Sequence, residues 1–179
     1  MIEELKEKAQ GCGSSIKAME DNILEVKDKF KEKSYDMVFC IGNSLVHLDN
    51  SKEIEKFFKD AKSILKEEGT LLFQVINYDR IISKEIKSLP TIYNEGADLT
   101  FERLYRYEET EQKVYFKTIL TVGKEKFQNE VPLYALQYDE AIKLLRNAGF
   151  NNIEAYGDFK GTRFDKENSY AMIISCKVK

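Results

Sequence analysis

The fold is decided by residues 35–48, which read Tyr35-Asp36-Met37-Val38-Phe39-Cys40-Ile41-Gly42-Asn43-Ser44-Leu45-Val46-His47-Leu48. Residues 37–41 are an unbroken apolar run, which is typical of a strand buried on both faces of a parallel sheet. The run ends at Gly42, Asn43 and Ser44, small residues that turn easily. Ligands of open α/β sheets bind beyond the carboxyl ends of the strands. This turn, with the sole histidine, His47, shortly after it, is therefore the first candidate for a site.

Composition narrows the class of protein. The 179 residues carry a net charge of -3, with 33% charged residues and two prolines, which predicts one compact domain without a basic surface for nucleic acid. No apolar run is long enough to predict a membrane span. Cys12, Cys40 and Cys176 are odd in number and widely spaced, which favours a reducing cytoplasm and no disulfide framework. One histidine and no clustered cysteines argue against a structural zinc site.

The clearest helix follows directly, beginning at Asn50 and Ser51. Glu53 stands where a capping box places it if Asn50 is the cap. Six apolar residues recur at helical spacing: Ile54, Phe57, Phe58, Ala61, Ile64 and Leu65. Gly69 is the expected helix stop, and residues 70–76 are the next buried strand, which ends in Asn77-Tyr78-Asp79. Strand, helix and strand together predict a right-handed βαβ unit with a binding edge.

The period of the sequence changes from residue 99. Residues 100–108 and 113–122 alternate between apolar and polar side chains around a turn at 109–112, and residues 126–134 continue the pattern, so we expect an antiparallel hairpin or meander. Its tyrosines could wall a substrate pocket, or the face could pack on the core. A second amphipathic helix over 138–148 stops at Gly149, and strands over 153–156 and 170–178 close a mixed sheet, parallel first and antiparallel at its end.

The first residues are harder to interpret. Residues 2–9 indicate a short helix, and Gly11-Cys12-Gly13 favours a helix stop over a nucleotide loop, because such loops follow a hydrophobic strand. Residues 16–19 are a weak strand that leads to Glu20-Asp21-Asn22. Acidic and amide groups there could accept a hydrogen bond from the exocyclic amine of a base such as adenine. The alternative is that Asp21 and Asn22 are turn formers.

These segments in this succession resemble class I S-adenosylmethionine-dependent methyltransferases, and most closely their glycine/sarcosine N-methyltransferase-like branch. The resemblance rests on Glu20-Asp21-Asn22, on residues 35–48, on Gly69-Thr70-Leu71-Leu72, on Asn77-Tyr78-Asp79 and on Gly157-Asp158-Phe159-Lys160. It runs over residues 1–179 and implies an α/β fold with a Rossmann-like, mostly parallel sheet. The C-terminal part would be antiparallel, and a substrate-side β region would be inserted at about residues 93–135.

The resemblance also implies roles for single residues. Asp21, Asn22 and Ile23 match the loop that holds the adenine of S-adenosylmethionine, and Ile41, Gly42 and His47 match the strand end that holds its methionyl portion. Asn43 and Tyr78 match positions that face a small-molecule methyl acceptor, an amine or a hydroxyl. Methyl transfer is an in-line displacement that depends mainly on proximity and alignment, and a sulfonium favours carbonyl oxygens and tyrosine faces.

Two departures from the family pattern qualify these expectations. Ile76 stands where the glycine-specific branch has an arginine before Asn-Tyr-Asp. The chain also starts at a helix, so the first βαβ unit with its glycine-rich cofactor loop is expected to be absent, which would leave an open edge on the strand over 37–41. The expected function is methyl transfer, incomplete in this chain alone, with pairing to a second copy or another chain. The alternative is a non-catalytic methyltransferase-like module, and a nicotinamide dehydrogenase is a weaker third hypothesis.

Overall fold

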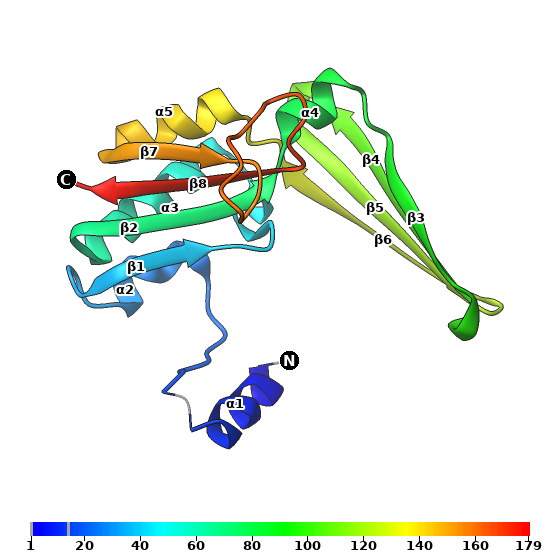
Figure 1. Cartoon of the computed structure of the whole chain (residues 1–179), viewed down its shortest axis with the longest axis horizontal. Coiled ribbons are helices and arrows are strands. Elements are labelled where there is room, and N and C mark those ends of the chain that lie inside the picture. Colours follow the sequence, from blue (N-terminus) through cyan, green and yellow to red (C-terminus); the bar gives the residue numbers. More distant parts are fainter. Residues whose placement is uncertain (1, 14) are drawn as a thin grey trace.

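The computed structural model describes residues 2–13 and 15–179 as two sheets and their covering helices (Figure 1). The first sheet has the order β1-β2-β8-β7 and the second the order β3-β4-β5-β6. The strands are β1 (Tyr35–Cys40), β2 (Leu65–Ile76), β3 (Ser88–Asn94), β4 (Leu99–Glu108), β5 (Lys113–Val122), β6 (Glu125–Tyr134), β7 (Phe150–Tyr156) and β8 (Ala171–Val178). The α-helices are α1 (Ile2–Gly11), α2 (Val26–Lys29), α3 (Ser51–Ile64), α4 (Tyr78–Ser83) and α5 (Tyr138–Ala148).

Helix α3 begins as the sequence predicts. The side chain of Asn50 accepts hydrogen bonds from the backbone N–H groups of Lys52 and Glu53, at 3.0 and 3.1 Å. Glu53 accepts in return from the N–H of Asp49, one residue before the cap. The predicted stop at Gly69 is wrong, because α3 ends at Ile64 and passes directly into β2. Glu68, immediately before Gly69, has a left-handed φ of 59° within β2.

The core of the first sheet lies on one face, which α3 and α5 cover (Figure 1). Paired residues of the two central strands point into it, and the rings of Phe58 on α3 and Phe73 pack at a tilt with their centroids 5.4 Å apart. The strand residues are Leu71, Phe73 and Val75 on β2 and Met172, Ile174 and Cys176 on β8, all fully buried. The apolar faces of α3 and α5 therefore pack on the sheet, as their apolar spacing predicts.

The opposite face of β1 is open. Met37, Phe39 and Ile41 are 47%, 64% and 45% exposed, so the prediction of a strand buried on both faces is wrong for this chain. The physical reason is that no described element packs over this face of β1, and these side chains are absent from the buried core; β1 is in addition the edge strand of its sheet. Residues 16–19 are not a strand either; they belong to an irregular segment that leads away from α1, which stands apart from the sheet (Figure 1).

The sheet is mixed, as predicted, but antiparallel pairing takes a larger share than expected. Only the β1–β2 pair is parallel among the described strands, whereas β2–β8 and β7–β8 are antiparallel. The reason is connectivity: β1 and β2 are joined by a crossover helix, which keeps strand direction, and β8 returns after a loop. Within the described residues no helix is long and apolar enough to cross a membrane.

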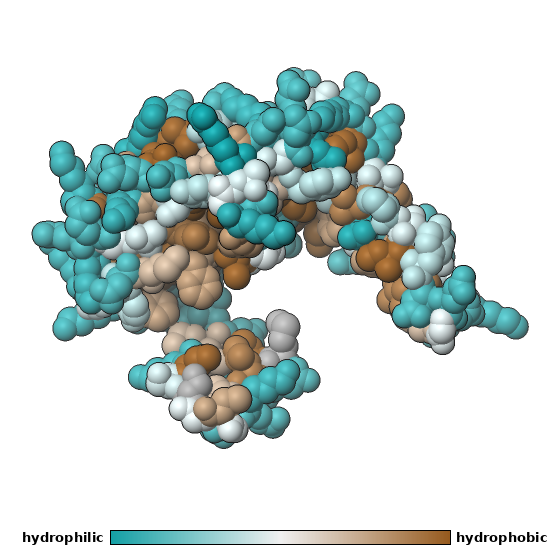
Figure 2. Space-filling model, viewed as in Figure 1, coloured by the Kyte–Doolittle hydropathy of each residue, from teal (hydrophilic) through white to brown (hydrophobic). Residues whose placement is uncertain are grey.

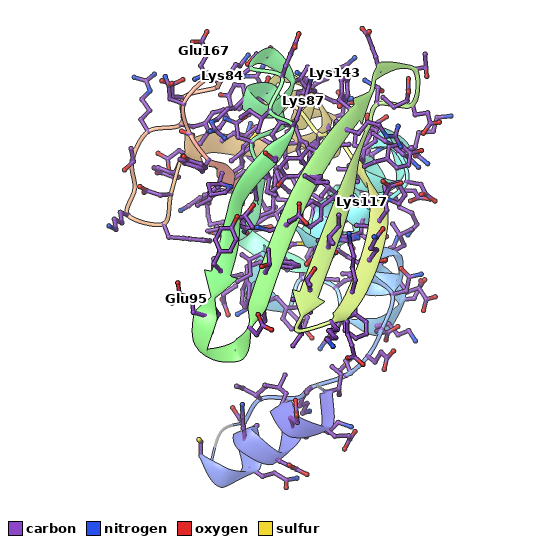
Figure 3. All side chains as sticks on the ribbon, turned by 90° about the vertical axis from the view of Figure 1, so that its right-hand side faces the viewer. Lys84, Lys87, Glu95, Lys117, Lys143 and Glu167 are labelled. Carbon is purple, nitrogen blue, oxygen red and sulfur yellow. The ribbon has the colours of Figure 1, made fainter. Side chains whose placement is uncertain are left out.

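The antiparallel meander is confirmed, with an additional strand, β3, at residues 88–94 that the sequence did not reveal. Phe101, Tyr105 and Tyr107 on β4 pair with Leu120, Phe116 and Val114 on β5, so these side chains share one face. We call it the inner face of the meander, because its near end packs on the main core. Lys117 projects from the opposite face, and Glu95 lies at the far tip (Figure 3).

Candidate functional site

The turn after β1 has the backbone geometry that its small residues predict. Gly42 has a φ of 78° and Asn43 a φ of 64°, both left-handed, and asparagine tolerates this conformation better than most residues. The N–H of Gly42 donates to the side chain of Gln74 on β2 at 2.9 Å. Ser44 closes the turn by donating to the carbonyl of Ile41. The exposed ends of β1 and β2 are thus held side by side.

Asn43 joins the two strand ends and the Asn-Tyr-Asp segment. Its side-chain oxygen accepts from the N–H of Ile76 at 2.9 Å, and its amide donates to the hydroxyl of Tyr78 at 3.3 Å. Tyr78 is fully buried. Burial raises the pKa of its hydroxyl, and the bond from Asn43 works against that rise. The structure therefore brings together the two residues predicted to face the acceptor, with Asn43 the more accessible of them.

The rest of the Asn-Tyr-Asp segment is tied to two other parts of the chain. Asn77, also buried, donates to backbone carbonyls of the loop over residues 165–169. Asp79 accepts from the N–H of Tyr138 at 2.8 Å, at the first residue of α5. The segment begins helix α4, which the sequence did not predict. Its hydrogen bonds hold the loop over residues 165–169 and the start of α5 beside the end of β2.

His47 ends a short 3₁₀ turn, Ser44–His47, in which Leu45 and Val46 are fully buried. These two anchors hold the turn on the core and leave the imidazole exposed. The position suits a ligand contact, and it also suits the alternative that His47 merely precedes the start of α3.

The second predicted segment, residues 21–23, is a cap rather than an open loop. Asn22 accepts from the N–H of Leu24 at 2.9 Å and begins the 3₁₀ turn Ile23–Glu25. Asp21 pairs with Lys29 at 3.4 Å, and Ile23 packs on the core. This agrees with the alternative in which Asp21 and Asn22 are turn formers. Their part in holding adenine stays a prediction.

The chain is hollowed between the first sheet and the meander, and apolar residues gather on both sides of this hollow (Figure 2). A separate cavity of about 470 Å³ lies between α4 and β4. It is lined mainly by Ile81, Ile82, Ile86, Tyr105 and Tyr107, and by none of the predicted site residues. Its volume is that of a small-molecule pocket.

Sequence reasoning missed Gln74. Gln74 had a visible signal, because it is the one polar side chain within the apolar run of residues 71–76. Tyr105 is one of the meander tyrosines for which the sequence left open a pocket wall or a core face; it is buried in the core and also lines the cavity beside α4.

The comparisons with known proteins agree with this geometry. Residues 1–73 match the family model described as a methyltransferase domain. The chain is 29% identical over 154 residues to a glycine/sarcosine N-methyltransferase of Aphanothece halophytica, covering 82% of the chain and 53% of the relative. It is 31% identical over 143 residues to a protein of the same name from Halorhodospira halochloris, covering 80% and 51%. The chain therefore spans about half the length of these two relatives.

Two solved structures have the same fold. The CcbJ methyltransferase of Streptomyces caelestis superposes with a TM-score of 0.85 at 21% identity, covering 100% of this chain and 75% of that one. An S-adenosylmethionine-dependent methyltransferase of Clostridium acetobutylicum gives 0.77 at 16% identity, covering 98% and 70%. Fold and sequence together support a class I S-adenosylmethionine-dependent methyltransferase, as the sequence predicted. Within that class, its sequence relatives are the glycine/sarcosine N-methyltransferases.

Proposed function

We propose that this chain carries the acceptor side, and part of the cofactor side, of a methyltransferase that acts on a small amine. The observation that carries the proposal is the pair of strand ends near Gly42 and Ile76, which Asn43 joins to each other and to Tyr78 beside an open hollow. Relatives that act on glycine and sarcosine support an amine over a hydroxyl acceptor.

The residues present fit S-adenosylmethionine at the end of β1. Gly42 is exposed with a positive φ, and a Cβ built on it would meet its nearest atom, the Ser44 hydroxyl, only at 4.0 Å, so a ligand can approach the backbone closely. Ile41 offers an exposed apolar side chain beside it. The bound cofactor would supply an activated methyl group on a sulfonium.

The chain's own contribution is alignment. Asn43 is held by two hydrogen bonds, one with the last residue of β2 and one with the first residue of α4, so its position is fixed before a substrate arrives. His47, on a turn anchored by buried neighbours, would contact the cofactor side. The apolar inner face of the meander would exclude water from the opposite side. Positioning of this kind is what an in-line displacement needs.

The same proposal includes a partner along β1. The strand is an edge whose apolar side chains are exposed, and such an edge is a template for addition of a strand from a second copy or another chain. A site at the end of β1 would gain a second wall from that partner. A cytoplasmic location is consistent with the three free cysteines, two of which are buried.

Titration of the full chain with S-adenosylhomocysteine tests the cofactor site. His47→Ala should weaken binding, because the exposed imidazole lies on the turn after β1, while the melting temperature stays unchanged. A matched control is Lys52→Ala, an exposed residue in the first turn of α3. If His47→Ala and Lys52→Ala bind equally well, His47 has no part in the site. Transfer of labelled methyl groups to sarcosine, with and without addition of a candidate partner, tests the activity.

A further inference from the structure

The meander has two outer strands, β3 and β6, and they differ in how their free edges are protected. β3 contains Pro90 and a register shift between Leu89 and Ile92, both of which interrupt the regular backbone that a further strand needs. β6 pairs with β5 in one unbroken register over residues 125–134, and residues 125–130 are exposed. No described strand lies along the free edge of β6 (Figure 1). A regular stretch of β6 is therefore open to a partner.

The register shows which backbone groups face this free edge. The N–H of Ala135 donates to the carbonyl of Gln112, just beyond the end of the β5–β6 ladder, so odd-numbered residues of β6 direct their backbone groups toward β5. Successive residues of a strand alternate in this direction. Pro132 agrees with the assignment, because proline within a sheet places its ring nitrogen toward a free edge. The outward-facing N–H and C=O groups of the exposed stretch are those of Lys126, Gln128 and Glu130.

The side chains of the same three residues are complementary to a second copy of the strand. An antiparallel pair of β6 strands centred on Gln128 places the two Gln128 residues opposite each other. Lys126 of each copy then lies opposite Glu130 of the other, so one pair of opposite charges forms twice. Within its own chain Glu130 has only a long ion pair, with Arg106 at 3.9 Å. The outward backbone groups and the charges therefore match in the same register.

Phe127 adds an apolar contact on the other face of this pairing. Its side chain is 56% exposed, and it lies on the inner face of the meander because it pairs with Leu120 of β5. In the register centred on Gln128, the two Phe127 side chains are diagonal neighbours across the symmetry axis. Such neighbours are about 7–8 Å apart, which aromatic side chains can span. Pairing would thus cover an aromatic side chain that a single chain leaves exposed to water.

We propose that two copies of this chain pair along residues 126–130 of β6, antiparallel and centred on Gln128. The two four-stranded meanders then form one continuous sheet. The same edge is used by both copies, so the contact closes on itself and gives a dimer rather than a filament. This contact is separate from the edge of β1, and it does not depend on the methyl-transfer reaction.

Disulfide trapping in the full chain tests the register. Every variant also carries Cys12→Ser, because Cys12 is the exposed member of the three cysteines. Gln128→Cys should link two copies on oxidation with copper phenanthroline, since hydrogen-bonded antiparallel neighbours have Cα atoms about 5.5 Å apart, within disulfide range. Lys126→Cys is the matched control on the same edge. Its two copies would lie four residues apart along the strands, about 13 Å, which is too far to link.

Sedimentation over a range of concentrations measures the strength of the pairing. Phe39→Lys is the background, so that association along β1 does not contribute. In this background Lys126→Glu should raise the dissociation constant of the dimer at least about tenfold, because like charges then face each other twice. Addition of Glu130→Lys should restore the dimer, because the two charges are then exchanged and opposite again.

Pairing along β6 is ruled out if Gln128→Cys and Lys126→Cys link equally well, or if neither links. It is also ruled out if the Phe39→Lys chain is a monomer at every concentration, or if Lys126→Glu leaves its dimer unchanged. A double variant that associates as weakly as Lys126→Glu alone would likewise contradict the proposed register. Retained circular dichroism spectra would show that the exposed substitutions leave the fold intact.

Discussion

Asn43→Ala removes three stabilising features of the strand-end turn at once. Asn43 is left-handed at a φ of 64°, a conformation that costs alanine about 1 kcal/mol. Its loss also leaves the N–H of Ile76 without the 2.9 Å bond and the buried hydroxyl of Tyr78 without its donor. An unsatisfied buried group costs about 1–3 kcal/mol. We therefore expect Asn43→Ala to lower the free energy of unfolding by about 3 kcal/mol, a large share of a typical domain's stability.

Urea unfolding followed by circular dichroism measures this loss, and Asn152→Ala is the control. Asn152 is also left-handed, at a φ of 47°, but it is exposed on β7. It should lose only the conformational part, about 1 kcal/mol. Asn43→Gly isolates the contribution of the two hydrogen bonds. Glycine keeps the left-handed turn but has no side chain to form either bond. Equal losses for Asn43→Ala and Asn152→Ala would refute the view that Asn43 joins the strand ends.

Four other outcomes follow from contacts away from the turn. Asp79→Ala should lower the free energy of unfolding in urea by about 1–3 kcal/mol, because it leaves the first N–H of α5 without its acceptor. An unchanged free energy of unfolding would mean that Asp79 does not stabilise the start of α5. Burial raises the pKa of the Cys40 thiol to about 11 and that of the Cys176 thiol to about 12, from 9.0. The folded state therefore favours the protonated thiols, so their contribution to stability should be intact below pH 9 and fall as the pH rises through these values. Thiol labelling at pH 8 should modify Cys12 rapidly and the other two only on unfolding; three rapid equivalents would contradict this. Phe39→Lys should reduce concentration-dependent association in sedimentation experiments, and an unchanged monomer for both proteins would argue against pairing along β1.

The elements predicted correctly from the sequence are those whose signal is local. Asn50 with Glu53 marks the start of α3, and Gly149 marks the end of α5 with a φ of 85°. The alternation over residues 100–108 and 113–122 predicted an antiparallel meander, because side chains in a strand point alternately to its two faces, and the structure pairs Tyr105 with Phe116 on one of these faces. The small residues at 42–44 fixed the turn after β1 for a similarly local reason.

Only the tertiary structure decided what surrounds these elements. An apolar run such as residues 37–41 does not reveal how many faces its neighbours cover, and β1 proved to be an open edge with Phe39 exposed. The bond from Asn43 to Tyr78 joins residues far apart in the chain, and Tyr105 of β4 is buried in the same core as Tyr78. Such meetings depend on how the meander packs against the first sheet. The sequence alone determined the class of fold and the turn at its candidate site, whereas the groups that face an acceptor were set by packing between distant segments.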